Sequence, residues 1–405
     1  MYQNKRSGFS PRRNRFGKKY TNSDYKRFSP ATTKQKSQLA GADPSIFIKK
    51  ASEITTEASY TPHNSFADFA ICNELKSNIV NRGYTHPTPI QDKAIEPILQ
   101  GRDLIGLANT GTGKTAAFLI PIINKIFQDR SQKALIVTPT RELASQINDE
   151  LKSFAAGMRI YSALTIGGSS LNRQIWDLQR NPSVVIGTPG RLKDLIKQRQ
   201  LNLSGFRTIV LDEVDLMVDI GFINDVKYFI SLLPSPRQSL FFSATIPSKV
   251  RELLNAFVKD PITVSVQTQG AAENIDQNVV KVNGGDKLDK LHDLLVQDSF
   301  DKVMIFGRTK HGIEKLGKQL STRGFSVGEI HGNRSQSQRL RTLKAFKENE
   351  FKVLLATDVA SRGLDIDNVS HVINYDLPET YTDYIHRIGR TGRVNKKGVA
   401  LTFVE

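Results

Sequence analysis

The sequence predicts an α/β fold with two tandem domains, each built on a parallel sheet. Short, nearly continuous apolar runs alternate with amphipathic stretches, which is typical of parallel strands covered by helices on both faces. The runs fall into two series, and a polar segment at residues 267–276 separates them. The 405 residues are enough for two domains of ordinary size, at about 100–200 residues each.

The positive charge of the chain is concentrated at its N-terminus. There are 57 Lys and Arg residues against 40 Asp and Glu residues, a formal net charge of +17. Residues 1–50 hold 13 of the cations and only two acids. Residues 1–45 lack a hydrophobic period, which predicts a basic disordered tail because so polar a segment cannot offset the entropy of ordering. The charge favours a polyanionic partner, with a merely soluble basic surface as the competing interpretation.

The apolar runs also set the expected domain boundaries. An N-terminal domain is predicted over residues 46–266, a linker over 267–276 and a C-terminal domain over 277–405. The expected strands of the first domain are 103–108, 134–138, 183–188, 208–212 and 239–243. Those of the second are 278–282, 302–306, 326–330, 352–357, 371–375 and 398–404. Ligands on such sheets bind beyond the carboxyl ends of the strands, which is where the motifs below fall.

A glycine-rich loop follows the first expected strand and precedes a helix. In the segment ANTGTGKT, residues 108–115, Gly111 and Gly113 let backbone N–H groups wrap phosphates at the positive end of that helix. Lys114 is expected to reach the β- and γ-phosphates, and Thr115 to offer a hydroxyl to Mg²⁺. Ala108 stands at the first glycine of the general pattern, and an incidental glycine-rich turn is the alternative interpretation.

Three carboxylates end another expected strand, in TIVLDEVD at residues 208–215. Asp212 at the strand tip is placed to hold Mg²⁺, often through water. Glu213 beside it is placed to orient and deprotonate an attacking water. A solvated acidic turn is the alternative, and the phosphate-binding loop upstream favours the catalytic interpretation.

These segments and several others closely resemble the DEAD-box RNA helicases from Phe66 to about Val404. The motifs stand in family order: GYTHPTPIQ (83–91, the Q motif), ANTGTGKT (motif I), PTRELA (139–144), Gly167-Gly168, TPGR (188–191), DEVD (motif II), SAT (243–245, motif III), IFGRT (305–309, motif IV), ATDVASRGLDI (356–366, motif V) and HRIGRTGR (386–393, motif VI). The resemblance implies two tandem RecA-like domains with parallel sheets behind a basic disordered tail. It also implies ATP and Mg²⁺ as cofactors and RNA as the partner.

For the ATP site the resemblance assigns roles motif by motif. Gln91 would read the Hoogsteen edge of adenine, which implies ATP over GTP. The implied nucleotide contacts are Phe66, Tyr84, Gln91, Thr110, Gly111, Thr112, Gly113, Lys114, Thr115 and Asp365. Metal binding falls to Thr115 and Asp212, and catalysis to Glu213, Lys114, Asp212, Arg390 and Arg393. Arg390 and Arg393 match arginine fingers, which stabilise transition-state charge once the domains close.

For RNA the resemblance implies contacts from both domains. They are Pro139, Thr140, Arg141, Gly167, Gly168, Thr188, Pro189, Gly190, Arg191, Thr309, Thr357 and Arg362. Backbone N–H groups and hydroxyls suit phosphates and 2′-OH groups, so we expect weak sequence preference on single strands or short duplexes. Coupling between the ATP and RNA sites is expected from Asp215, Ser243, Thr245, His386 and Arg387.

The function predicted from these motifs is ATP-dependent, local and non-processive RNA unwinding or ribonucleoprotein remodelling. Ribosomal-precursor and messenger ribonucleoproteins are equally compatible with it, and a monomer in the cytoplasm is expected, with no membrane partner. An ATP-gated RNA clamp with little turnover, a DNA-directed helicase and a passive chaperone acting through the tail are the alternatives. Val214 stands where the family usually has Ala, and we expect activity to persist with altered coupling. Asn109 stands where motif I usually has Gln.

Overall fold

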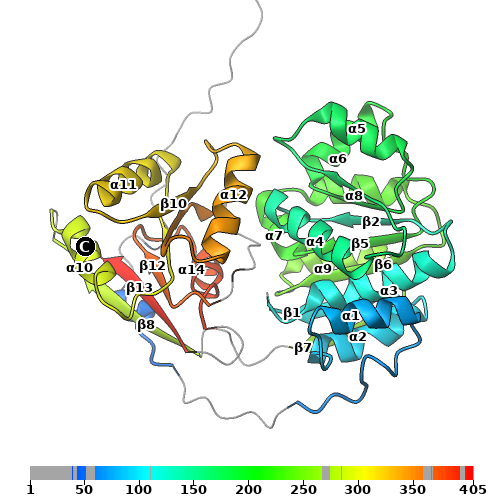
Figure 1. The fold of residues 1–405 in the computed structure, drawn as a ribbon, viewed down its shortest axis with the longest axis horizontal. Coiled ribbons are helices and arrows are strands. Elements are labelled where there is room, and N and C mark those ends of the chain that lie inside the picture. The colour runs from blue at the N-terminus through cyan, green and yellow to red at the C-terminus, as the bar shows by residue number, and fades with distance from the viewer. Residues whose placement is uncertain are drawn as a thin grey trace, which may run out of the picture. The chain divides into compact units, whose positions relative to one another are not determined.

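The structure is a computed structural model of the chain, and it describes residue 39 and residues 43–51, 60–109, 111–266, 274–283, 285–358, 366, 368–392 and 397–404. The described elements form two parallel sheets, each with helices on both faces (Figure 1). The α/β class and the two tandem parallel-sheet domains expected from the sequence are therefore confirmed. Most of the predicted tail lies outside the described residues.

The first domain contains a seven-stranded parallel sheet in the order β3-β4-β2-β5-β6-β1-β7. Its strands are β1 (Leu104–Ala108), β2 (Ala134–Val137), β3 (Ser162–Thr165), β4 (Val184–Gly187), β5 (Thr208–Asp212), β6 (Gln238–Ser243) and β7 (Ile262–Val266). Its helices are α1 (Asn73–Asn81), α2 (Pro89–Leu99), α3 (Lys114–Gln128), α4 (Arg141–Phe154), α5 (Leu171–Gln179), α6 (Pro189–Lys197), α7 (Val214–Ile220), α8 (Ile223–Leu232) and α9 (Ser248–Phe257).

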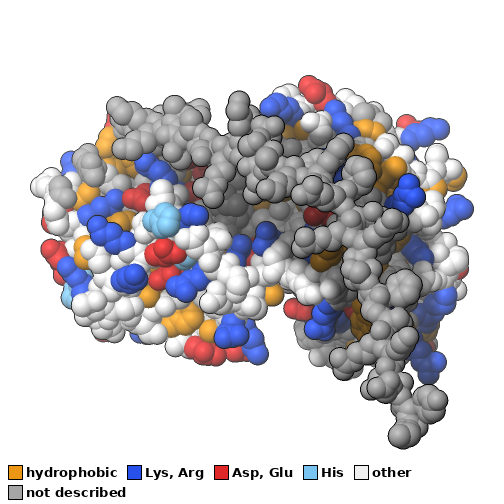
Figure 2. Space-filling view, turned by 90° about the horizontal axis from the view of Figure 1, so that it is seen from above, with side chains coloured by type: hydrophobic (Ala, Val, Ile, Leu, Met, Phe, Trp, Pro, Cys, Tyr) orange, Lys and Arg blue, Asp and Glu red, His pale blue; other side chains and the backbone are white. Residues whose placement is uncertain are grey.

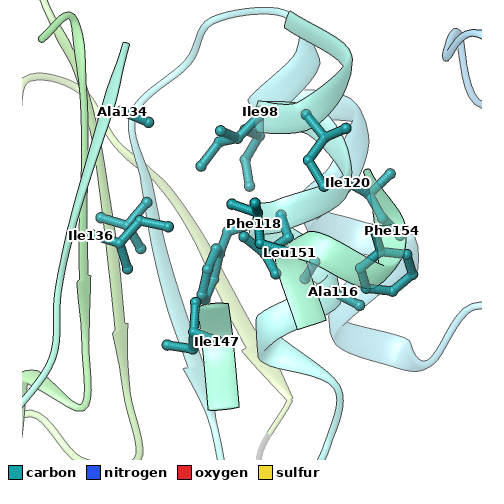
Figure 3. Packing of buried hydrophobic residues seen from close by; sticks show 14 of the residues in the cluster. Ile98, Ala116, Phe118, Ile120, Ala134, Ile136, Ile147, Leu151 and Phe154 are labelled. Atoms are coloured by element: carbon teal, nitrogen blue, oxygen red, sulfur yellow. The ribbon is translucent and has the colours of Figure 1, made fainter. Parts of the chain in front are cut away.

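Alternate side chains of the central strands enter two separate cores. In β2, Ala134 and Ile136 pack with α1 to α4, whereas Leu135 and Val137 pack with α6 to α9. Successive strand residues point to opposite faces, so a strand buried on both faces must be apolar throughout. Figure 3 shows the first of these cores, where Phe118 of α3 lies between the sheet and the neighbouring helices.

The second domain contains a six-stranded parallel sheet in the order β10-β11-β9-β12-β13-β8. Its strands are β8 (Ile275–Lys281), β9 (Val303–Phe306), β10 (Val327–Ile330), β11 (Val353–Ala356), β12 (His371–Asn374) and β13 (Gly398–Val404). Its helices are α10 (Lys287–Leu295), α11 (Lys310–Thr322), α12 (Gln336–Lys347) and α14 (Tyr381–Ile388). The core under α10 and α11 is distinct from the core under α12, as alternation along β9 requires.

Three strands differ from the sequence-based expectation. The sequence does not predict β3 and β7, because these edge strands are only partly buried and lack a continuous apolar run. It also starts the second domain too late, since β8 begins at Ile275, within the expected linker. Ile275 is fully buried, and the polar residues that follow it pair with β13 at the sheet edge. A prediction from composition alone therefore assigns this stretch to a linker.

The residues before the first domain hold a further difference. A 3-10 helix η1 covers Pro44–Phe47, and Lys49 pairs with Gln277 of β8 in an antiparallel bridge. These residues pack with the second sheet, although the sequence assigns 44–45 to the tail and 46–51 to the first domain. The physical reason is one buried side chain, Phe47, in a segment that is otherwise exposed or half-buried.

Outside the first 50 residues the charges are nearly balanced, at a net +6. Figure 2 shows Lys and Arg side chains intermixed with Asp and Glu over the described surface seen from above. No helix in the described part of the chain has both the length and the apolar character to cross a membrane.

We expect Phe118→Ala to destabilise the first domain by about 3–5 kcal/mol, because it leaves a cavity in the core. The Phe118 ring is fully buried, and its centroid lies 5.2 Å from that of the Phe242 ring. Val80→Ala is the matched control, since Val80 is 66% exposed on α1. Urea unfolding followed by the fluorescence of Trp176, the only tryptophan, reports on this domain. Equal shifts for both variants would contradict the core assignment.

His371 is expected to make the second domain less stable in mild acid. Its ring stacks on Phe300 with centroids 3.8 Å apart, and burial lowers its pKa below the usual 6.5. As the pH falls, His371 is therefore protonated in the unfolded chain before it is protonated in the folded chain. The free energy of unfolding is unaffected by His371 above pH 6.5 and decreases below it, by at most about 1.4 kcal/mol per pH unit.

The test compares the unfolding free energy of the wild type and His371→Phe between pH 5 and pH 7 by circular dichroism. The variant keeps the stacked ring without the titrating group, so its stability should fall less steeply in acid. His311→Phe, at a 75% exposed side chain, is the control. Superimposable pH profiles of the wild type and His371→Phe would exclude this role for His371.

Candidate functional site: an ATP site and an RNA surface on the sheet edges

The loop between β1 and α3 has the geometry of a phosphate-binding turn. Gly111 and Gly113 have φ angles of +81° and +92°, in the left-handed region that favours glycine, and α3 begins directly after them. The unpaired N–H groups of the first turn of α3 provide the positive end for an anion. Lys114 is 7% exposed, and its Nζ donates to the carbonyl of Ala108 at 2.9 Å. The loop thus holds an ammonium group and backbone donors together, while Thr110 lies outside the described residues.

Gln91 braces this loop from the side of α2. Its side chain is fully buried; Nε2 donates to the carbonyl of Gly113 at 3.1 Å, and Oε1 accepts from the N–H of Thr88 at 3.0 Å. A Cβ at position 113 would collide with Nε2, so glycine allows the close approach. Thr112 and Thr115 are half-buried beside it. In this structure both amide atoms of Gln91 are bonded within the protein, and the contact with adenine stays a prediction.

The two predicted aromatic contacts of the nucleotide belong to the core. Phe66 is 5% exposed, and its ring lies edge-on to Tyr84 with centroids 6.0 Å apart. Tyr84 packs in turn on Phe154 at 5.5 Å and donates from its hydroxyl to Glu150 at 3.2 Å. Both rings pack in or against the core of the first domain. Their contact with a base stays a prediction.

Asp92 is a residue of this region that the sequence does not single out. It is 4% exposed and accepts hydrogen bonds from the Tyr60 hydroxyl at 2.5 Å, the His63 N–H at 2.8 Å and both the N–H and Nδ2 of Asn64, at 3.1 and 2.9 Å. One carboxylate therefore ties the chain upstream of Phe66 to α2, next to Gln91. A single acid in an amphipathic helix carries no signal from which this role follows.

Asp212 and Glu213 form a buried acidic pair at the carboxyl end of β5. They are 2% and 7% exposed, and the N–H of Glu213 donates to Oδ1 of Asp212 at 3.0 Å. Glu213 has a φ of +55°, a left-handed conformation that is costly for this side chain and that turns the strand into α7. Burial, with the charge of Asp212 and against that of Lys114, raises the pKa of Glu213 to about 7. Burial also raises the pKa of Asp212.

This acidic pair fits a magnesium ion that arrives with a nucleotide. Oε2 of Glu213 is buried with no hydrogen-bond partner among the described residues, and burial disfavours the charged forms of both carboxylates, which raises both pKa values. No three His, Cys, Asp or Glu side chains gather into a metal site in the described ranges. Mg²⁺ is commonly held by one or two carboxylates together with phosphates and water, so Asp212 and the Thr115 hydroxyl are a suitable protein share.

Motifs II and III are joined by a short hydrogen-bond network. Oδ2 of Asp215 accepts from the N–H and the hydroxyl of Thr245 at 3.0 and 2.9 Å, and the N–H of Asp215 donates to Oγ of Ser243 at 3.3 Å. The Ser243 hydroxyl donates to the carbonyl of Thr245 at 2.7 Å. Val214 is fully buried in the core under α6 to α9, so its two extra methyl groups pack there. The predicted coupling residues of the first domain are thus in mutual contact.

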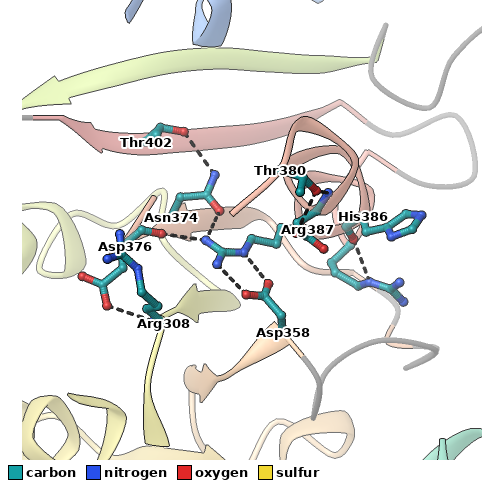
Figure 4. A network of polar contacts seen from close by, with 10 residues as sticks. Arg308, Asp358, Asn374, Asp376, Thr380, His386, Arg387 and Thr402 are labelled. Atoms are coloured by element: carbon teal, nitrogen blue, oxygen red, sulfur yellow. Dashed lines mark hydrogen bonds and ion pairs between the residues drawn. The ribbon is translucent and has the colours of Figure 1, made fainter. Parts of the chain in front are cut away.

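Arg387 anchors motif VI within the second domain. Its guanidinium binds Asp358 through Nε and Nη2 at 2.5 and 2.7 Å, and its Nη1 donates to Oδ1 of Asn374 at 3.2 Å and to the carbonyl of Asp376 at 2.7 Å (Figure 4). Arg387 is 2% exposed. A bidentate pair of this kind fixes both position and orientation. Asp358 lies within the sequence motif ATDVASRGLDI, but the sequence does not identify it as this partner.

The remaining motif VI residues follow α14. Arg390 is buried, and its Nε donates to the carbonyl of His386 at 3.2 Å. Arg393 and Asp365 lie outside the described residues, so their assignments remain expectations.

The predicted RNA contacts of the first domain follow three neighbouring strands. Thr140 caps α4 after β2, Gly167 and Gly168 follow β3, and Thr188 caps α6 after β4. These strands are adjacent in the sheet order β3-β4-β2, so their carboxyl ends lie side by side at one edge. The other predicted contacts of this edge are Pro139, Arg141, Pro189, Gly190 and Arg191.

Arg141 and the glycine pair are packed together at this edge. The Arg141 guanidinium lies against Gly167 and Gly168, and a Cβ on Gly168 would collide with it. Gly168 also has a φ of +76°, which a side chain would strain. Nη1 of Arg191 donates to the carbonyl of Ser169 at 3.3 Å. The first domain thus presents two arginines and a bare backbone turn together.

The second domain repeats this arrangement on adjacent strands. Thr309 follows β9 and caps α11, with its Oγ1 accepting from the N–H of Gly312 at 3.0 Å. Thr357 follows β11, the neighbour of β9, and its N–H donates to the carbonyl of Ile330 at 3.3 Å. Arg362 lies outside the described residues.

The carboxyl edge of the first sheet is therefore divided into two parts. The phosphate loop, the acidic pair and motif III follow β1, β5 and β6, which are neighbours in the order β5-β6-β1. The predicted RNA contacts follow β3, β4 and β2 on the other side of β5. Motif II, on β5, lies at the boundary between the two groups.

Comparison with known proteins agrees with this geometry. Residues 88–253 match the family described as DEAD/DEAH box helicase, and residues 286–395 match the helicase conserved C-terminal domain. The ATP-dependent RNA helicase CshA of Listeria monocytogenes is 43% identical over 342 residues, which are 84% of this chain and 66% of that protein. The DEAD-box ATP-dependent RNA helicase CshA of Geobacillus kaustophilus is also 43% identical, over 84% of this chain and 73% of its own length.

A solved structure shows the same fold. Dbp5 of S. cerevisiae, bound to RNA and ADP BeF3, is 34% identical with a TM-score of 0.75, covering 84% of this chain and 89% of that one. Relatives of this identity and coverage, together with two consecutive helicase domains, establish the assignment. The chain belongs to the DEAD-box family of RNA helicases, and its two parallel-sheet domains are RecA-like.

Proposed function

We propose that this chain is an ATP-dependent RNA helicase that separates short duplexes locally and without processive movement. The observation that carries the proposal is the division of one sheet edge, with phosphate-binding and acidic loops on β1, β5 and β6 and bare-backbone, arginine-bearing loops on β2, β3 and β4. A single rigid sheet thus presents an ATP site next to a surface suited to a ribose-phosphate backbone. The names of the relatives and the RNA bound to Dbp5 support the same activity.

In the proposed mechanism the phosphate loop binds ATP through its backbone N–H groups, and Lys114 exchanges the carbonyl of Ala108 for the phosphates. Thr115 and Asp212 would hold Mg²⁺, which neutralises charge on the phosphates. Glu213 would then take a proton from the attacking water, since its Oε2 is buried and has no hydrogen-bond partner among the described residues.

Domain closure would complete the site and act on the RNA. Arg390 and Arg393 then stabilise the charge that develops on the γ-phosphate. The network of Asp215, Ser243 and Thr245 links motif II to motif III, so a change at the γ-phosphate reaches the loop after β6. The RNA-facing loops bind backbone groups of one strand, which predicts weak dependence on base sequence.

Glu213→Gln should abolish RNA-stimulated ATP hydrolysis while leaving ATP binding nearly unchanged. The amide keeps the size of the side chain but cannot accept the proton, so we expect kcat to fall at least about 100-fold. Asp219→Asn, an exposed acid on the same helix α7, is the matched control and should keep wild-type turnover. Steady-state hydrolysis with and without single-stranded RNA measures both.

Two results would contradict this proposal. One is RNA-stimulated turnover that survives Glu213→Gln. The other is a wild type that binds RNA in an ATP-dependent manner but shows no RNA-dependent turnover, which would assign the chain to an ATP-gated clamp.

Gly168→Ala should weaken RNA binding without affecting ATP binding. The added methyl group displaces the Arg141 guanidinium and strains a turn with positive φ, so we expect about a tenfold loss, roughly 1.4 kcal/mol. The loss should be the same for unrelated strands of equal length. Gly157→Ala is the matched control, because Gly157 has a similar φ of +75° but open space around it. Fluorescence anisotropy with a non-hydrolysable ATP analogue measures the affinities, and equal losses in both variants would refute the assignment.

A further inference from the structure

A short segment that precedes the first domain in sequence is docked on the second domain. We call residues 43–51 the docked segment. The N–H of Lys49 donates to the carbonyl of Gln277 at 3.0 Å, and the N–H of Gln277 donates to the carbonyl of Lys49 at 2.7 Å. The N–H of Ala51 donates to Oδ1 of Asp276 at 2.8 Å. The segment thus adds an antiparallel bridge to β8, the edge strand of an otherwise parallel sheet.

One side chain of the docked segment enters the second domain. Phe47 is 1% exposed, whereas its neighbours Ile46 and Ile48 are 41% and 52% exposed. The Phe47 ring lies 4.9 Å from the ring of Tyr384, at an interplanar angle of 60°. It shares a hydrophobic cluster with Ile275, Ile388, Ala400 and Val404. Most of the apolar contact of the segment therefore comes from Phe47.

The partners of Phe47 lie on the helix that carries motif VI. Tyr384 and Ile388 lie on α14, before and after His386 and Arg387 in the sequence. Arg390 follows the end of this helix. The Tyr384 hydroxyl donates to Oε1 of Gln277, the same residue whose backbone pairs with Lys49. The docked segment therefore contacts α14 directly through Phe47 and indirectly through Gln277.

Two separate groups of contacts among the described residues help to hold α14 in the second domain. One is the ion pair of Arg387 with Asp358 together with its bonds to Asn374 and Asp376. The other is the apolar cluster around Phe47. Arg390 is itself bonded to α14, since its Nε donates to the carbonyl of His386. A shift of the helix would therefore move Arg390 with it.

We propose that Phe47 is a positioning residue for ATP hydrolysis, which fixes α14 from outside the two matched helicase domains and so sets the position of Arg390. This inference rests on the function proposed above. Catalytic groups must be held to within a fraction of an ångström, and a misplacement of about 1 Å can cost about 100-fold in rate. A purely structural Phe47 would change the stability of the chain and leave the chemistry of the folded protein intact.

The test compares Phe47→Ala, Phe47→Leu and Ile48→Ala in the full chain. Ile48 lies next to Phe47 and is exposed, so Ile48→Ala is the matched control. We expect Phe47→Ala to lower the RNA-stimulated kcat by about tenfold to 100-fold and to change KM for ATP less than about twofold, because ATP binds the loop of the first domain. Phe47→Leu should restore most of kcat, and Ile48→Ala should match the wild type.

Hydrogen–deuterium exchange provides a second readout that does not require activity. In Phe47→Ala the amides of α14 should exchange faster, while those of β9 and β12 stay protected, which shows that the second domain is still folded. Unchanged kcat in a folded Phe47→Ala, or equal effects of Phe47→Ala and Ile48→Ala, would overturn the proposal. Faster exchange throughout the second domain would also overturn it, because Phe47 would then stabilise the domain as a whole.

Failure of the positioning role of Phe47 can be distinguished from failure of the proposed helicase function. If the wild type shows no RNA-stimulated turnover, the helicase proposal fails and Phe47 has no reaction to position, whatever the exchange data show. If the wild type is active and α14 loosens in Phe47→Ala without a loss of kcat, only the positioning role fails.

Discussion

Parallel strand pairing is the constraint on which the rest of this structure depends. A parallel pair needs a crossover that returns the chain to the starting edge, so every strand ends at the same edge and a loop leads from there into the next helix. All seven strands of the first sheet and all six of the second pair in this way. The ends of many loops and the starts of many helices therefore meet in two narrow regions. Motifs I, II and III lie in such loops after β1, β5 and β6, where residues far apart in sequence come together.

The buried acids of motif II, Asp212 and Glu213, lose hydration because they lie at such a strand end. A carboxylate at the tip of a buried strand loses water, and its charged form is disfavoured until a cation arrives. Glu213 shows this in its pKa of about 7 and in its Oε2, which has no hydrogen-bond partner in the part of the chain that the structure describes; its backbone is also left-handed. Lys114 offsets only part of this effect, because its charge lowers the pKa values of Asp212 and Glu213 while burial and the neighbouring acids raise them. Strain and unmet charge of this kind are typical of a site organised for a ligand.

Sequence reasoning succeeds where burial leaves a periodic signal. The central strands β2, β4 and β5 are buried on both faces and mostly apolar, apart from Thr208 and Asp212 at the ends of β5, and the sequence predicts them with nearly correct bounds. The edge strands β3 and β7 are short and only partly buried, and polar residues interrupt their apolar ones, so the sequence misses them. The loops with phosphate and acidic chemistry are predicted because glycine, lysine and carboxylate types are required there whatever the surrounding packing.

Contacts that depend on one side chain are not predictable in the same way. Asp92 collects four hydrogen bonds from residues 60–64, yet its surroundings in sequence are ordinary. Asp358 becomes the partner of Arg387 only through the fold. Phe47 is the one buried residue in a short segment, and only the tertiary structure shows that it belongs to the second sheet while Ile46 and Ile48 stay exposed.

The docked segment also decides where the N-terminal cations are attached. Because residues 43–51 bond to β8, the 42 residues before them join the molecule at the second domain, although they precede the first domain in sequence. The cations of these residues are therefore joined through the chain to the second domain, so a polyanion that they bind would be held near that domain at raised effective concentration. A fluorophore or affinity tag fused to residue 1 would accordingly be tethered to the second domain.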